Sequence, residues 1–153
     1  MTASKDKLKI ELLKQEWEML SNSIETLLLS VEKCKNIGNK EQYLFEELES
    51  FDSLTSKFNC SSDIYTQKVL RTIWMLLHEP FALYIDMMNI AEKMNLIVSA
   101  DKMIEIRDLR NQIAHEYIPE AITELIPEVI ELTASLENSV NKTEDFIRSR
   151  HWI

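Results

Sequence analysis

The sequence contains little of the two residues that make tight turns, with one glycine and three prolines among 153 residues. A fold with many strands needs a turn between successive strands, and glycine and proline supply much of that turn chemistry. Hydrophobic residues make up 45% of the chain, which is enough for a globular core. We therefore expect a single all-α domain over residues 1–153, an up-and-down bundle of five or six helices similar to a four-helix bundle.

The sequence also lacks the patterns of several kinds of site and of membrane proteins. The two cysteines, Cys34 and Cys60, do not have the spacing of metal ligands, so we expect free thiols in a reducing compartment. There is no Gly-rich phosphate loop and no helical H-E-x-x-H, and we expect no cofactor and no metal. Aliphatic runs such as Leu27–Leu29 are far shorter than the roughly 20 residues of a membrane span, and charges occur throughout the N-terminal stretch. The expected protein is cytoplasmic and does not contact a membrane.

The net charge of the chain limits the kinds of molecule that it is expected to bind. The chain has 26 acidic and 17 basic residues and a net charge of −9. Unspecific binding of nucleic acid depends on the neutralisation of phosphates, so this balance argues against it. It is compatible with a local basic cleft, and it suits docking onto a basic protein partner.

The longest predicted helix covers residues 4–36. Apolar side chains recur there at alternating spacings of three and four for more than three heptads. This pattern favours a core helix of an antiparallel bundle, and the alternative is that part of it, including Trp17, packs against another subunit. The only glycine, Gly38, fits the left-handed position that follows a helix end.

The remaining helices are predicted from apolar spacing, caps and prolines. Residues 59–63 are expected to form a loop in which Ser61, Ser62 or Asp63 caps the next helix. Three further helices are predicted at residues 41–58, 64–77 and 81–94. The next helix is capped by Ser99 or Asp101 and ends near Ile118. The last helix begins at Pro119 and reaches about residue 148, with a kink or a restart at Pro127.

The segment Glu105–Tyr117 contains the strongest candidates for chemistry. Arg110 lies beside an apolar stripe formed by Ile106, Leu109 and Ile113, and a guanidinium near a core needs a partner or a wet cleft. On a straight helix, which turns about 100° per residue, Arg110 and His115 lie roughly 140° apart. They can serve one phosphate only if the helix is distorted or a second subunit closes the site. We therefore expect a homodimer whose two-fold axis brings both segments together.

The residues Arg110, Asn111, His115 and Tyr117 form the string R-N-x-x-x-H-x-Y. It resembles the motif of HEPN domains (higher eukaryotes and prokaryotes nucleotide-binding), in particular the small bacterial toxins paired with a minimal nucleotidyltransferase antitoxin. Upstream segments resemble the helices of that group in order, so the resemblance covers most of the chain after Glu41. These segments are Leu44–Phe58, Gln67–Ile73 and Asn95–Tyr117.

The resemblance implies an endoribonuclease that cuts RNA without a metal. His115 would move protons around the ribose 2′-hydroxyl and the leaving oxygen, Arg110 would stabilise the phosphate, and Asn111 would orient one of them. It also implies that the cognate nucleotidyltransferase transfers AMP to Tyr117, which adds negative charge and bulk to the site. Arg107 has two open interpretations, a surface ion pair with Asp108 or Glu105 and an RNA contact.

A second function remains open at this stage. Related helical proteins have been viewed as substrate-binding subunits that complete a separate nucleotidyltransferase and have no catalysis of their own. The fold serves either role. The intact set of Arg110, His115 and Tyr117 favours the ribonuclease, and the acidic balance favours the binding subunit.

Overall fold

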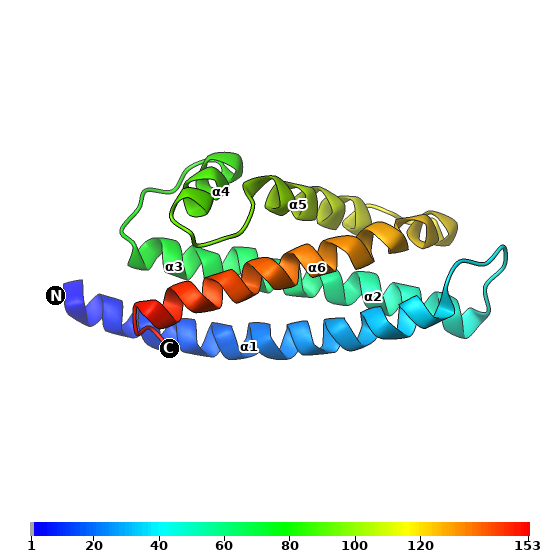
Figure 1. Cartoon of the computed structure of the whole chain (residues 1–153), viewed down its shortest axis with the longest axis horizontal. Helices are drawn as coiled ribbons and strands as arrows, with labels where there is room; N and C mark the ends of the chain where they lie inside the picture. The colour runs from blue at the N-terminus through cyan, green and yellow to red at the C-terminus, as the bar shows by residue number, and fades with distance from the viewer. Residues whose placement is uncertain (1) are drawn as a thin grey trace.

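The structure, a computed structural model, describes residues 2–153, so that Met1 of the predicted domain lies outside the described residues. Its regular elements are all helical, which confirms the predicted all-α class (Figure 1). They are α1 (Thr2–Ile37), α2 (Phe45–Asp63), the π-helical segment η1 (Ile64–Val69), α3 (Leu70–Leu76), α4 (Tyr84–Lys93), α5 (Ala100–Ala114) and α6 (Pro119–Ser149).

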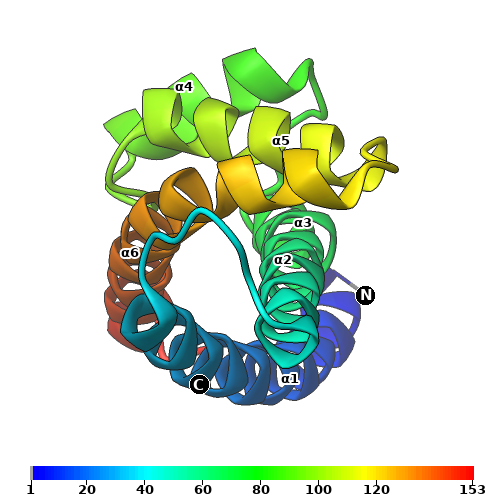
Figure 2. The ribbon, with the colours of Figure 1, turned by 90° about the vertical axis from the view of Figure 1, so that its right-hand side faces the viewer.

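Four long helical stretches surround the core, as the view along the bundle shows (Figure 2). These are α1, the continuous rod from α2 through η1 to α3, then α5 and α6, and they run alternately up and down (Figure 1). Helix α4 packs against α5 on the outside of this ring. None of the described helices has both the length and the apolarity that a membrane crossing needs.

The heptad pattern of α1 lies inside the chain's own core. Seven of its positions are buried, from Leu13 to Cys34, and Trp17 is 8% exposed. They belong to one cluster of buried residues to which all six α-helices contribute. The interpretation as a core helix of a bundle is therefore confirmed. Gly38 follows α1 with φ of 70°, the left-handed conformation expected at this position.

The predicted loop at residues 59–63 is wrong, because α2 continues through it to Asp63. Serine and asparagine favour loops since their side chains compete for backbone hydrogen bonds. Here tertiary contacts outweigh that preference. Ser61 and Ser62 are buried, and the hydroxyl oxygens of Ser61 and of Ser23 on α1 lie 2.6 Å apart. A loop at this place would remove these serines from the helix interface.

Helix limits differ from the predictions at three other places. Helix α2 begins at Phe45 rather than 41, because the Glu47 carboxylate accepts a hydrogen bond from the Leu44 N–H at 2.9 Å and caps the helix there. Helix α4 begins at Tyr84 rather than 81, and α5 ends at Ala114 rather than near 118. The predicted cap of α5 is confirmed, because the Ser99 side chain accepts a hydrogen bond from the Lys102 N–H. Helix α6 begins at Pro119 and passes through Pro127 without a restart.

The π-helical segment is anchored to α6 by a buried polar group. The Tyr65 hydroxyl lies 2.9 Å from the hydroxyl oxygen of Ser139 and 2.7 Å from that of Thr143. Thr143 in turn donates to the Leu96 carbonyl at 2.8 Å. Burial raises the pKa of Tyr65 well above its usual value. These bonds fix the wide turn that follows Asp63, which is where the candidate site begins.

Candidate functional site

Helix α5 presents Arg110 at the edge of the core. Its N-terminus is fixed by the Ser99 side chain, which accepts from the Lys102 N–H at 3.2 Å. The predicted apolar stripe is buried, as is Met103 before it. Arg110 lies beside this stripe with 31% of its side chain exposed, so its guanidinium is neither fully solvated nor enclosed.

The partner of Arg110 is Asp63, the last residue of α2. Arg110 Nε and Nη2 donate to the two oxygens of the Asp63 carboxylate, each at 2.8 Å. A planar fork of donors facing two acceptor oxygens is the strongest arrangement that an arginine makes with a carboxylate. It raises the pKa of Arg110, chiefly through the hydrogen bonds to Asp63. The ion pair explains how an arginine is tolerated beside an apolar stripe.

Polar groups surround this pair and line a cavity of about 130 Å³. The Asn59 amide donates to the Arg110 carbonyl at 3.4 Å. Three buried side-chain oxygens have no hydrogen-bond partner among the described residues, and two of them lie near this pair, Asn59 Oδ1 and Ser62 Oγ. Ser62 lines the cavity together with Asp63, Arg110 and Asn111. Buried polar atoms are nearly always hydrogen-bonded, so unpartnered ones beside a charged pair indicate a polar site.

Arg107 lies next to the same cavity and has two partners of its own. Its Nη2 donates to Asp108 Oδ1 at 3.2 Å, which is the surface ion pair considered from the sequence. Its guanidinium carbon also lies 4.9 Å from the ring centre of Tyr84. Burial raises the pKa of Tyr84 to about 12, and its hydroxyl donates to the Met103 carbonyl at 3.2 Å. Tyr84 is therefore a neutral, fixed wall of the cavity.

His115 and Tyr117 lie beyond the end of α5. His115 is the C-cap residue, with φ of −104° and ψ of 4°, and its side chain is exposed. It does not line the cavity that contains Arg110 and Asn111. The expected side-chain bond from Asn111 to His115 is not formed, although the His115 N–H donates to the Asn111 carbonyl at 3.2 Å. Within one chain, His115 therefore does not share the cavity that Arg110 lines.

The prediction that α5 extends to about Ile118, and so includes Tyr117, is wrong. Tyr117 follows the helix end in the short connection to α6 and is 85% exposed. The Glu116 carboxylate accepts from the backbone N–H groups of Tyr117 and Ile118, at 3.2 and 3.1 Å. These bonds shape the connection so that the tyrosine projects into solvent.

Asp63 and Ser62 are the site residues that the sequence did not reveal. The sequence pattern predicts both as candidate helix caps, because a short polar stretch before an apolar run is typical of a helix start. The place of Arg110 beside an apolar stripe indicates from the sequence that an acidic side chain faces it. The sequence alone could not select that acid, since Asp63 lies 47 positions away and the choice depends on how α2 and α5 align.

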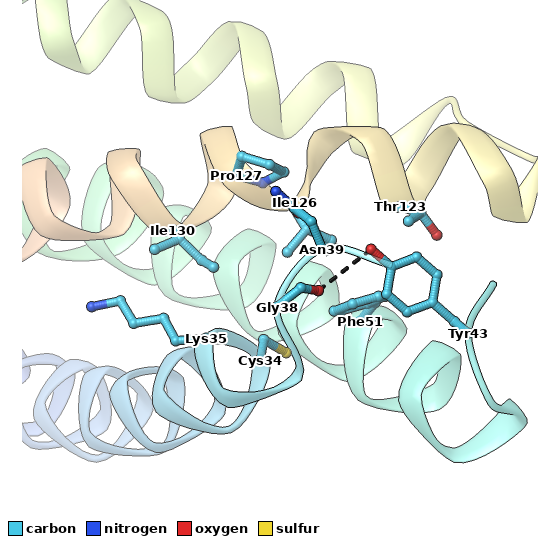
Figure 3. Close-up of a pocket in the computed structure, with 10 residues that line it drawn as sticks. All are labelled: Cys34, Lys35, Gly38, Asn39, Tyr43, Phe51, Thr123, Ile126, Pro127 and Ile130. Atoms are coloured by element: carbon cyan, nitrogen blue, oxygen red, sulfur yellow. Dashed lines mark hydrogen bonds between the residues drawn. The ribbon is translucent and has the colours of Figure 1, made fainter. Parts of the chain in front are cut away.

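Another cavity lies at the end of α1 and carries no comparable chemistry (Figure 3). It has a volume of about 190 Å³ and is lined by Cys34, Phe51 and the Tyr43 ring, whose hydroxyl donates to the Gly38 carbonyl at 3.4 Å. Burial raises the pKa of the Cys34 thiol, so the reactive thiolate is disfavoured. Among the described residues, no group of three or more His, Cys, Asp or Glu side chains is arranged to hold a metal ion.

Comparison of the chain with protein-family models, curated proteins and solved structures finds no match. The site is therefore interpreted from its own residues.

Proposed function

We propose that this chain is a HEPN-type endoribonuclease of the cytoplasm, the toxin of a pair whose antitoxin is a minimal nucleotidyltransferase. The observation that carries the proposal is the R-N-x-x-x-H-x-Y string at the end of α5, with its arginine held in a fixed orientation by Asp63. The two bonds to Asp63 use two of the five N–H donors of Arg110. The remaining three have no partner among the described residues, and they can bind a phosphate.

The reaction requires a base, an acid and a cation. His115 accepts the proton of the ribose 2′-hydroxyl while the 2′-oxygen attacks the neighbouring phosphorus. The bond between phosphorus and the 5′-oxygen breaks, and a protonated imidazole gives a proton to that oxygen. Arg110 stabilises the negative charge that builds up on the phosphate. The products are a 2′,3′-cyclic phosphate and a 5′-hydroxyl, and no step uses a metal.

The active form is a homodimer in this proposal. His115 does not line the cavity of Arg110, which supports a site that takes the two groups from different protomers. A two-fold axis beside the α5 end brings Arg110 of one protomer toward His115 of its partner, whose imidazole takes the 2′-hydroxyl proton and, once protonated, gives a proton to the leaving oxygen. Asn111 lines the cavity beside Arg110 and orients it or the phosphate.

The nucleotidyltransferase silences the toxin by adding AMP to Tyr117. The exposure of this side chain supports the assignment, because Tyr65 is completely buried and Tyr43 and Tyr84 are partly covered. The added phosphodiester brings negative charge close to the site that binds RNA phosphate. Arg107 contributes a further RNA contact from the rim of the cavity.

A second candidate is a non-catalytic subunit that binds substrate for the nucleotidyltransferase. The net charge of −9 and the Asp63 carboxylate beside Arg110 favour it, since both repel RNA phosphates. Expression of the chain alone in a bacterium separates the two candidates. The ribonuclease arrests growth and degrades RNA, and co-expression of the nucleotidyltransferase restores growth. A harmless chain would instead support the binding subunit.

A further inference from the structure

A cavity of about 460 Å³ lies next to the site, between η1–α3 and α4. It shares three lining residues, Thr66, Gln67 and Tyr84, with the small cavity of Arg110. The two cavities are therefore neighbours. The volume lies within the range of about 300–1,000 Å³ that small ligands occupy in proteins.

Three of the eleven residues that line this cavity are aromatic, namely Trp74, Phe81 and Tyr84. Trp74 forms one wall, and its orientation is fixed because the indole N–H donates to the Pro80 carbonyl at 2.9 Å. Phe81 stands at the opening with 55% of its surface exposed, and the guanidinium carbon of Arg71 lies 5.5 Å from its ring centre. Aromatic rings and guanidinium planes are the surfaces on which unpaired nucleobases stack in proteins that bind single-stranded nucleic acid.

Polar groups are placed where such a ligand would need them. The exposed side-chain amide of Gln67, at the boundary of the two cavities, donates to Asp63 Oδ1 at 3.5 Å, and its second N–H and its oxygen can pair with the edge of a base. In the neighbouring cavity, Ser62 is 3% exposed and its hydroxyl has no partner among the described residues. That hydroxyl and the free N–H donors of Arg110 suit the ribose and phosphate of a nucleotide whose base lies in the aromatic cavity.

Charge supports an anionic ligand at this place in spite of the acidic chain. Three arginines border the two cavities, Arg71, Arg107 and Arg110, and the carboxylate that lines them is that of Asp63. A planar ring that carries a phosphate matches this combination of aromatic walls and cations. An apolar peptide side chain would match the walls and leave the free N–H donors of Arg110 unused.

We propose that the Trp74–Phe81 cavity binds the base of the nucleotide next to the phosphate that Arg110 holds. The cavity thereby favours RNA in which this base is unpaired, because a base within a duplex must first be unpaired and unstacked, at an energetic cost, to enter it. The assignment rests on the proposed ribonuclease function for its biological meaning. Its physical content, binding of a base beside a phosphate, is measurable without any cleavage.

The test is NMR of the full ¹⁵N-labelled chain with nucleoside 5′-monophosphates at millimolar concentration. The Trp74 indole signal and the Gln67 amide signals should shift on titration, while the indole signals of Trp17 and Trp152 stay in place. Ribose 5-phosphate, which has the phosphate and no base, should leave the Trp74 signal unchanged. An unmoved Trp74 signal with the nucleotides, or an equal shift with ribose 5-phosphate, would overturn the assignment.

Variants connect the signal to the cavity. Phe81→Ala and Arg71→Ala should each weaken nucleotide binding about tenfold, a loss within the range found for stacked bases. The matched controls are Phe45→Ala, an exposed phenylalanine at the start of α2, and Arg150→Ala, whose guanidinium carbon lies 4.6 Å from the Phe146 ring centre at the end of α6. Both controls should bind as the wild type does. Equal binding by Phe81→Ala and the wild type would overturn the proposal.

The outcomes separate this inference from the proposed function. If the chain cuts RNA but its Trp74 signal does not shift with nucleotides, the ribonuclease function is supported and the base pocket is refuted. If nucleotides shift the Trp74 signal but the chain cuts no RNA, the base pocket is supported and the ribonuclease function is refuted. Cleavage of an oligonucleotide with an abasic residue beside the cleaved bond adds a second measurement, in which the wild type should be slower than on the intact RNA.

Discussion

Arg110 of α5 and Asp63 of α2 face each other as a fork and a carboxylate, with both donor–acceptor distances at 2.8 Å. The pair joins residues that are 47 positions apart, and it lies at the point where the α-helical winding of the rod changes to the π-helical segment. π-Helical turns inside longer helices are frequent at functional sites. The relationship suggests that Asp63 holds the guanidinium in position while its remaining donors face the cavity.

The first prediction concerns Asp63→Asn. The variant removes one charge and loosens the fork, so kcat for RNA cleavage should fall about tenfold or more, as misplacement of a catalytic group does. KM should stay constant or decrease, because a carboxylate that repels RNA phosphate is gone. Stability should fall by only about 1 kcal/mol, since the pair is partly exposed.

The matched control for this variant is Glu144→Gln. Glu144 accepts from both Nε and Nη2 of Arg148 on the surface of α6, at 3.1 and 2.8 Å. It should leave kcat and KM unchanged. A rise in KM with an unaltered kcat in Asp63→Asn would contradict a positioning role.

The second prediction concerns the buried hydroxyl of Tyr65. Tyr65→Phe leaves the Ser139 hydroxyl without this partner and removes the link from η1 to α6. We expect a loss of about 1–2 kcal/mol in the free energy of unfolding, measured by urea denaturation. The fully solvated Tyr117→Phe should change stability by less than about 0.5 kcal/mol. Equal stability of Tyr65→Phe and the wild type would show that the polar group does not support the π-helical segment.

The features that depend on neighbouring residues in the chain were predictable from the sequence. The Ser99 cap, the left-handed Gly38 and the start of α6 at Pro119 each follow from one residue type in one local conformation. The heptad pattern of α1 is equally local, because its spacing identifies the buried face without knowledge of the helices that cover it.

The remaining features depend on contacts between distant segments. The loop predicted at 59–63 is absent because Ser61 packs against Ser23 of α1. The Asp63 partner of Arg110 depends on the alignment of two helices, and so do the two cavities around Tyr84. Tyr117 was placed on the helix because the end of α5 was set three or four residues too late.

The third prediction is that Tyr117 is the AMP acceptor. Incubation of the chain with its cognate nucleotidyltransferase and ATP should add the mass of AMP to the peptide that contains Tyr117, detected by mass spectrometry. Tyr117→Phe should take up no label, and Tyr43→Phe should be labelled as the wild type is, since Tyr43 lies in the α1–α2 connection beside another cavity. Equal labelling of Tyr117→Phe would exclude this tyrosine as the modified residue.

The fourth prediction is the dimer. Light scattering at micromolar concentration should give twice the chain mass of 18.0 kDa. Mixing Arg110→Ala chains with His115→Ala chains should restore part of the cleavage activity, because a heterodimer contains one site with both wild-type residues. A monomer that cleaves RNA would refute the composite site, as would a mixture that stays inactive.

The central claim, that Arg110 and His115 carry a metal-independent RNA cleavage, is tested most directly by digestion of total cellular RNA with the purified chain in EDTA. The wild type should produce fragments with cyclic phosphate ends. Arg110→Ala and His115→Ala should each lose activity by several kcal/mol of transition-state stabilisation, on the order of a hundredfold or more, with the fold retained. Arg148→Ala and His151→Ala, matched residues at the other end of α6, should cleave normally. Intact RNA with the wild type, or equal cleavage by His115→Ala, would contradict the account and favour the binding subunit.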